Sequence, residues 1–152
     1  ASYQRTMLLQ KSQEELEARY AKMPSRIKAK KMRDLVEKGP ESDYVPAAFG
    51  RLAKMCADME KELSQTPWLM GEEFSLADTL VVAYMYRLEC LGLTALWEAN
   101  YPGVTDWYRR MKERPSMQKA IGPYLNKDQL AMIKKAGKEA FLSNPAFSEY
   151  LT

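Results

Sequence analysis

Histidine is absent from all 152 residues of this sequence. A Ser-His-Asp triad, a Cys-His pair and a histidine-based zinc site therefore cannot be built from this chain alone. Cysteine is nearly as scarce, since only Cys56 and Cys90 occur and no CxxC motif joins them. We expect both thiols to be buried and reduced, as in a cytosolic protein. The missing histidine alone excludes most familiar hydrolytic chemistry.

Long apolar runs and a strong charge of one sign are also missing. No apolar segment approaches the roughly 20 residues that span a bilayer, and no signal-like core follows Ala1. The net charge of +3 gives no strong bias toward nucleic acid or an anionic membrane. We expect a single cytoplasmic domain over residues 1–152, without a membrane partner or a metal site. Because the first residue is not Met, we favour a piece of a longer protein.

The chain is predicted to be all-α, because no segment alternates with a period of two between hairpin turns. Pro, Gly and capping residues divide it into helical segments joined by short loops, with 41–45 and 67–71 as connections. A capping box at Ser12 and Glu15 opens the first clear helix. The expected helices cover residues 12–23, 25–38, 46–64, 75–91, 104–113, 116–121 and 126–141.

The helix that begins at Ser75 is the central element of this prediction. Ser75 and Asp78 form an N-terminal capping box, in which each side chain pairs with the backbone N–H of the other residue. Apolar residues then spread around the whole circumference until Gly92, which predicts a core helix buried on most sides. With no base to activate the Ser75 hydroxyl, we assign this pair to structure and not to catalysis.

The segment around this helix resembles the C-terminal helical domain of glutathione transferases. The match covers about residues 49–121, and the stretch from Lys38 to Leu63 is similar to the bacterial branch of β-etherases and reductive dehalogenases. One position departs from the pattern. Relatives usually carry an aliphatic residue that packs against the position of Phe74, but this chain has Thr79 there. We therefore expect Phe74 to pair with Leu80 instead. The resemblance is carried by Pro67-Trp68-Leu69-Met70-Gly71, Phe74-Ser75-Leu76-Ala77-Asp78, Leu91-Gly92-Leu93, Leu96-Trp97, Pro102, Trp107 and Arg114-Pro115-Ser116.

The resemblance implies a helical bundle that packs against an N-terminal thioredoxin-like domain, which this chain does not contain. That domain would bind most of the glutathione and hold the residue that activates its thiolate. The chain alone would then be inactive, with its first helix cut short at Ala1 and residues 122–152 packing on the bundle as an extension. By the same resemblance, the helical half would form a homodimer and one wall of the pocket for a hydrophobic small molecule, through Tyr3, Arg5, Met7 and Phe141.

Two other functions remain open at this point. Similar stand-alone modules dock protein partners in translation factors and aminoacyl-tRNA synthetases, and a helical bundle could also sequester a hydrophobic ligand. A basic cluster lies in the helix at 25–38, but a helix spreads its members over several faces. We therefore interpret it as a solvated surface and do not expect nucleic acid as a partner. The cluster consists of Arg26, Lys28, Lys30, Lys31 and Arg33.

Overall fold

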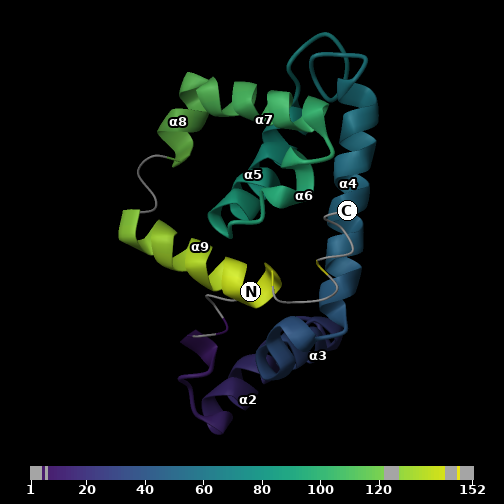
Figure 1. Cartoon of the computed structure of the whole chain (residues 1–152). Coiled ribbons are helices and arrows are strands. Elements are labelled where there is room, and N and C mark those ends of the chain that lie inside the picture. The colour runs from purple at the N-terminus through teal and green to yellow at the C-terminus, as the bar shows by residue number, and fades with distance from the viewer. Residues whose placement is uncertain (1–4, 6, 122–126, 143–146, 148–152) are drawn as a thin grey trace.

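The computed structural model describes residues 5, 7–121, 127–142 and 147, and the predicted all-α class is confirmed within them (Figure 1). No strand occurs in these ranges, apart from one isolated bridge between Trp68 and Gly71. Among the described helices, no stretch combines the length and the hydropathy of a membrane span. The elements are α2 (Gln13–Ala21), α3 (Arg26–Lys38), the 3-10 helix η1 (Gly39–Glu41), α4 (Tyr44–Leu63), α5 (Leu76–Cys90), α6 (Ala95–Glu98), α7 (Pro102–Glu113), α8 (Pro115–Ile121) and α9 (Lys127–Leu142).

Local capping residues begin the first helices where the sequence predicted. Ser12 accepts a hydrogen bond from the Glu15 N–H at 3.2 Å, and the Glu15 carboxylate accepts one from the Ser12 N–H at 3.0 Å. Ser25 caps α3 in the same way through the Lys28 N–H at 3.4 Å. These bonds satisfy backbone donors that have no partner within the helix. The expected loop at 41–45 is only partly correct, because α4 already begins at Tyr44.

The core lies where α4, α5, α6 and α7 meet, and in Figure 1 α9 lies below α5, α6 and α7. Each of these helices contributes side chains that are almost completely removed from water, which is the main source of stability in a small domain. The thiols of Cys56 and Cys90 are free and buried within this core, as predicted. Its largest fully buried apolar side chains are Trp97, Trp107, Phe147, Met85, Leu93, Leu96 and Val104.

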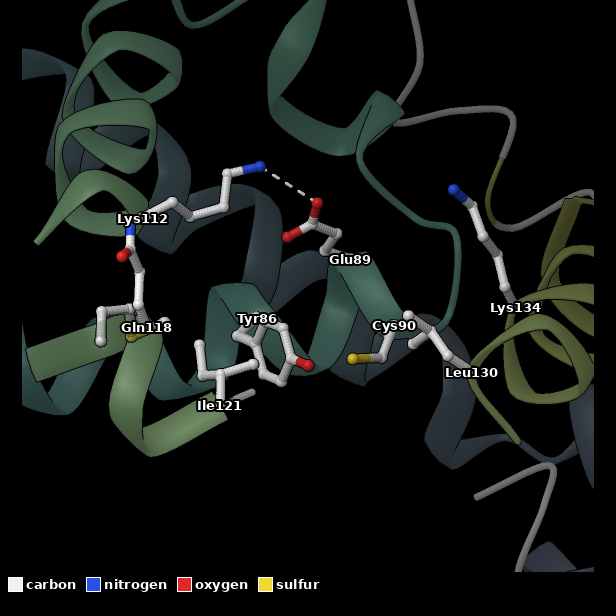
Figure 2. Close-up of a pocket in the computed structure, with 9 residues that line it drawn as sticks. Tyr86, Glu89, Cys90, Lys112, Gln118, Ile121, Leu130 and Lys134 are labelled. Carbon is white, nitrogen blue, oxygen red and sulfur yellow. Dashed lines mark hydrogen bonds and ion pairs between the residues drawn. The ribbon is translucent and has the colours of Figure 1, made fainter. Parts of the chain in front are cut away.

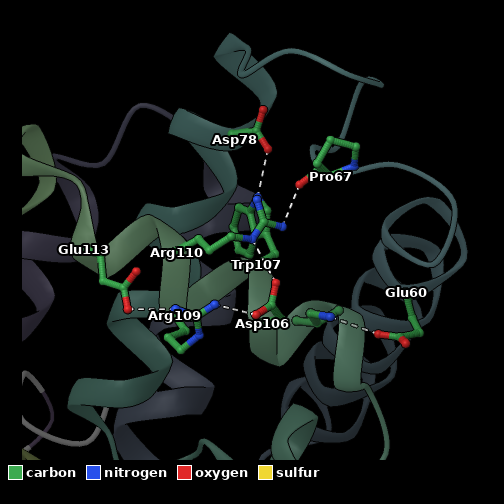
Figure 3. Close-up of polar contacts among 9 residues, drawn as sticks. Glu60, Pro67, Asp78, Asp106, Trp107, Arg109, Arg110 and Glu113 are labelled. Atoms are coloured by element: carbon green, nitrogen blue, oxygen red, sulfur yellow. Dashed lines mark hydrogen bonds and ion pairs between the residues drawn. The ribbon is translucent and has the colours of Figure 1, made fainter.

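The N-terminus of α7 is capped by a side chain from another helix. Tyr101, the residue before it, makes no side-chain capping bond. Instead the Glu60 carboxylate of α4 accepts hydrogen bonds from the N–H groups of Gly103 at 3.0 Å and Val104 at 2.9 Å (Figure 3). A negative charge at this end also suits the helix dipole. This contact fixes α7 against α4 across more than 40 residues of sequence.

Replacing Glu60 with alanine is expected to lower the free energy of unfolding by about 1–2 kcal/mol, the usual cost of a lost helix cap. Chemical denaturation followed by circular dichroism measures this change. Glu62→Ala is the matched control, because Glu62 is exposed on the same helix and should change stability by at most about 0.5 kcal/mol. Equal effects of the two substitutions would rule out the capping role of Glu60.

Two glycines allow α9 to cross the end of α5. Gly92 adopts a φ of 72°, in the left-handed region that favours glycine, and α5 ends just before it as predicted. A Cβ on Gly137 of α9 would lie 2.1 Å from the Leu91 carbonyl oxygen, so the two backbones are in direct contact there. Further along α9, the Phe141 ring meets Phe49 of α4 edge-on, with centroids 5.6 Å apart.

Candidate functional site

The buried carboxylate of Asp78 organises the start of α5. It is fully removed from solvent and lies between the 67–75 loop, α5 and α7 (Figure 3). One of its oxygens accepts hydrogen bonds from the Leu69 N–H at 3.1 Å and the Trp107 indole at 2.8 Å. The other accepts from the Ser75 N–H at 2.9 Å and the Ser75 hydroxyl at 2.8 Å. The predicted capping box is therefore present, and it also ties in a distant tryptophan.

The charge state of Asp78 links this cluster to pH. Burial acts to raise the pKa of the carboxyl, but the hydrogen bonds from Leu69, Trp107 and Ser75 outweigh it and hold the pKa below the ordinary value of 3.8. A group whose pKa is lower in the folded than in the unfolded state stabilises the protein above the unfolded pKa. That contribution is lost as the pH falls through the folded-state pKa.

We therefore expect Asp78→Asn to be less stable than the unmodified chain by an amount that is constant from about pH 5 to 7. The gap should shrink below about pH 4, because only the aspartate protein loses this stabilisation on protonation. Urea denaturation at a series of pH values measures the unfolding free energy of both proteins. The other carboxylates contribute equally to the two proteins, so their effect cancels in the difference. A gap that stays unchanged down to pH 3 would contradict a depressed pKa at this residue.

Stacked cations hold the 67–75 loop against α7 and α8. The guanidinium of Arg110 lies 4.6 Å from the centroid of Trp68 and donates to the Pro67 carbonyl at 2.7 Å (Figure 3). The guanidinium of Arg114 lies 3.7 Å from the centroid of Phe74, whose ring in turn meets Trp68 edge-on. Phe74 thus packs on Trp68 and Arg114. Leu80 is 67% exposed, and its pairing with Phe74 stays a prediction.

A cavity of about 420 Å³ lies among α5, α7, α8 and α9. At its rim the Lys112 amine pairs with the Glu89 carboxylate at 3.1 Å, and Tyr108 donates a short hydrogen bond to the same carboxylate. Figure 2 shows the side chains of Tyr86 and Cys90 beside this pair. Burial, a hydrogen bond with Cys90 and the nearby negative charges raise the pKa of Tyr86 to about 12. Its phenol is therefore neutral at pH 7.

No described side chain has both the geometry and the electrostatic surroundings of an activated nucleophile. Burial raises the pKa of the Cys56 thiol to about 11, which leaves it protonated and unreactive at neutral pH. Burial and the Glu89 carboxylate likewise raise the pKa of Tyr108. Within the described ranges, no group of three or more Cys, Asp or Glu residues is placed to hold a metal ion.

One face of α5 is apolar and exposed, which corrects the prediction that this helix is buried on most sides. Asp78, Val82, Met85, Leu88 and Cys90 face the core. The opposite face carries an apolar stripe, defined by side chains at four-residue spacing. They are Leu76, Leu80 and Tyr84, which are 80%, 67% and 65% exposed.

The substrate-binding residues predicted from the resemblance occupy different surroundings. Arg5 donates through Nε to the Val36 carbonyl at 2.8 Å and through Nη2 to the Glu37 carbonyl at 3.1 Å, so it caps the end of α3. Met7 lies two residues further on and is about half exposed. Phe141 packs in the core on Phe49, and no contact among the described residues joins it to Arg5. Tyr3 lies outside the described residues. Their substrate-binding roles stay predictions.

The basic cluster on α3 is partly engaged within the chain. Arg33 pairs with Glu17 at 2.7 Å and lies over the ring of Tyr20, 5.1 Å from its centroid. The Lys31 amine lies over Tyr44, 5.2 Å from the ring centroid. These contacts join α3 to α2 and α4. They favour a structural role for the cluster over the binding of nucleic-acid phosphates, which would require unpaired cations.

A family model described as "Glutathione S-transferase, C-terminal domain" matches residues 12–115, more than half of the chain. Among curated proteins, the chain is 30% identical over 86 residues to glutathione S-transferase GstB of Escherichia coli (strain K12), which covers 54% of this chain and 40% of that protein. It is 31% identical over 80 residues to the tetrachloro-p-hydroquinone reductive dehalogenase of Sphingobium chlorophenolicum, covering 53% and 32%.

A longer but weaker similarity connects the chain to ganglioside-induced differentiation-associated protein 1-like 1 of Homo sapiens. It is 27% identical over 136 residues, which cover 82% of this chain and 37% of that protein. The chain thus spans less than half the length of the curated relatives it matches. No solved structure matches it with significance. The all-α bundle, the capping box and the family match agree, and this chain belongs to the glutathione S-transferase C-terminal domain family.

Proposed function

We propose that the chain is the substrate-pocket and folding half of a glutathione-dependent transferase. In this proposal the glutathione thiolate attacks a hydrophobic electrophile, and a thioredoxin-like domain outside the chain binds and activates the glutathione. The assembled protein is a cytoplasmic homodimer that detoxifies such electrophiles. Tyr3, Arg5, Met7 and Phe141 remain the proposed contribution of this half to the substrate wall. The family match and the names of two relatives, a transferase and a reductive dehalogenase, support this reaction class.

The observation that carries the proposal is the apolar stripe of Leu76, Leu80 and Tyr84 on α5. Contiguous exposed apolar surface of this kind commonly marks an interaction site on a soluble protein. The stripe is held rigidly, because the opposite face of the same helix is fixed in the core by Asp78 and Met85. A rigid apolar face on the central helix is suited to a permanent contact between domains. We assign it to the thioredoxin-like domain.

The chemistry of the described residues supports the same division of roles. A transferase that uses glutathione must stabilise a thiolate, which requires hydrogen-bond donors or positive charge beside the sulfur. The cavity beside Tyr86 is lined by Lys112 and Lys134, but the Lys112 amine is already paired with the Glu89 carboxylate at 3.1 Å. Tyr108 also donates to that carboxylate, so the negative charge of Glu89 lies at the rim of the cavity. In this proposal thiolate activation is assigned to the thioredoxin-like domain.

The coding sequence upstream of Ala1 tests the proposal directly. We expect an open reading frame that continues in frame and encodes a thioredoxin-like domain. An in-frame stop codon followed by an initiation codon at this chain would contradict the proposal and favour a non-enzymatic module.

Substitution of the apolar stripe gives a second test on the chain itself. We expect the 152-residue chain to self-associate through this stripe, and Leu80→Glu to weaken that association at least ten-fold, as measured by sedimentation velocity. The unfolding free energy should change by no more than about 0.5 kcal/mol, since Leu80 is largely exposed. Ile27→Glu is the control, because Ile27 is 79% exposed on the distant α3. A monomeric unmodified chain, or equal effects of both substitutions, would contradict the role of the stripe.

A further inference from the structure

A second apolar depression lies between α5 and α8, on a different face of α5 from the stripe. This groove has a volume of about 360 Å³. That volume lies at the lower end of the range for small-molecule sites and suits a ligand of one or two rings. Three hydroxyl-bearing residues line it, namely Thr79, Tyr86 and Ser116, and among the described residues of the lining only Arg114 is charged. The apolar lining includes Phe74, Val82, Ala83, Met111, Met117 and Ile121.

Arg114 brings a positive charge without a neutralising carboxylate to this groove. Its Nε is buried without a hydrogen-bond partner, and within the described residues no carboxylate forms an ion pair with its guanidinium. A mostly apolar groove that holds one cation without a neutralising carboxylate favours a ligand with a negative charge. The neighbouring Arg110 differs, because Asp106 at 2.8 Å and the Pro67 carbonyl at 2.7 Å occupy its donors.

The aromatic residues of the loop hold the Arg114 guanidinium in place before any ligand arrives. Its central carbon lies 3.7 Å from the centroid of Phe74 and 5.7 Å from that of Trp68. Cation–π contacts fix the plane of the cation without using its N–H donors. A planar, pre-oriented guanidinium is suited to bind a carboxylate through two parallel hydrogen bonds. Little conformational entropy would then be lost on binding.

We propose that this groove binds a small amphipathic anion, namely an aromatic carboxylate of one or two rings. The carboxylate pairs with Arg114 at the end of the groove formed by Phe74. The ring system lies on the apolar wall between α5 and α8, which includes Val82 and Met117. This site is independent of the proposed transferase role, because it uses neither the stripe nor a second domain.

Isothermal titration calorimetry with 1-naphthoate and its uncharged analogue 1-naphthamide tests the site on the 152-residue chain. Both probes fill the same volume, and only naphthoate can pair with a cation. We expect naphthoate to bind at least ten-fold more tightly than the amide. Arg114→Gln should remove this preference, and Arg114→Lys should retain part of it, since lysine keeps the charge but loses the two-pronged geometry.

Two further variants distinguish binding at this site from non-specific hydrophobic binding. Ala83→Trp, at an exposed groove position, should weaken the binding of both probes by filling the apolar volume. Arg109→Gln should leave both affinities unchanged, because Arg109 is exposed and already paired with Asp106 and Glu113. Thermal unfolding confirms that each variant remains folded. Equal affinities of the two probes, no binding of either, or full retention of the naphthoate preference in Arg114→Gln would overturn the proposal.

Discussion

Asp78→Ala is expected to lower the free energy of unfolding by about 3–5 kcal/mol, a large part of the 5–15 kcal/mol that is typical of a domain. The substitution removes the acceptor of four hydrogen bonds at a site with no exposure to solvent. The indole of Trp107 and the N–H groups of Leu69 and Ser75 would lose their partner. Each unsatisfied buried donor costs about 1–3 kcal/mol, and partial relaxation keeps the sum below the maximum. Denaturant unfolding at pH 7 measures the loss.

Asp58→Ala is the matched control for this prediction. Asp58 is also helical and charged, but its ion pair with Lys54 at 2.8 Å lies on the exposed surface of α4. Such pairs contribute only about 0.3–0.5 kcal/mol. If Asp78→Ala cost no more than Asp58→Ala, the carboxylate would not be the structural centre that the contacts indicate.

Gly137→Ala is expected to destabilise the protein by about 2 kcal/mol, although alanine is the better helix former. In an open helix the same change gains about 1 kcal/mol. Here the new Cβ would lie 2.1 Å from the carbonyl oxygen of Leu91, which belongs to backbone and cannot rotate away. Helix α9 must therefore shift from the end of α5, which would also disturb the contact of Phe141 with Phe49. Thermal and urea unfolding both report the change.

The sign of the stability change distinguishes the packing effect at Gly137 from helix propensity. Ala131→Gly, at an exposed position of the same helix, should cost about 1 kcal/mol through helix propensity alone. Alanine is thus favoured at position 131 and disfavoured at position 137. A Gly137→Ala protein that is more stable than the unmodified chain would show that α9 does not approach α5 as closely as described.

Helix boundaries that depend on local chemistry could be predicted from the sequence. Ser12, Ser25 and Ser75 each begin a helix by bonds that reach only three residues ahead or back, so their signal lies within one short segment. Gly92 ends α5 for an equally local reason, its positive φ. Helix α6, Ala95–Glu98, was not predicted, because a single turn is too short to show a period.

Contacts between distant segments could not be predicted in the same way. Nothing near Glu60 or Trp107 indicates that the first caps α7 or that the second binds Asp78, since each bond spans 29 or more residues. One indirect signal was present: α7 begins at Pro102 without a capping side chain before it, so its N–H groups required a partner from elsewhere.

The candidate sites show a similar limit. Apolar residues surround α5 on every side, so the sequence could not reveal that Leu76, Leu80 and Tyr84 face solvent. The predicted substrate residues came from a resemblance alone, and the structure engages Arg5 with the carbonyls of α3 and Phe141 with Phe49. The position of Arg114 in an apolar groove depends on how α5 packs against α8, so the sequence alone could not predict it.

The division of labour between this chain and a thioredoxin-like domain is tested most directly by assaying the 152-residue chain itself. The measurement combines retention on glutathione-agarose with turnover of glutathione and a chlorinated aromatic substrate. We expect no retention and no rate above the uncatalysed reaction, because the described residues supply no thiolate-activating group. Specific retention together with catalysed turnover by this chain would contradict the proposal.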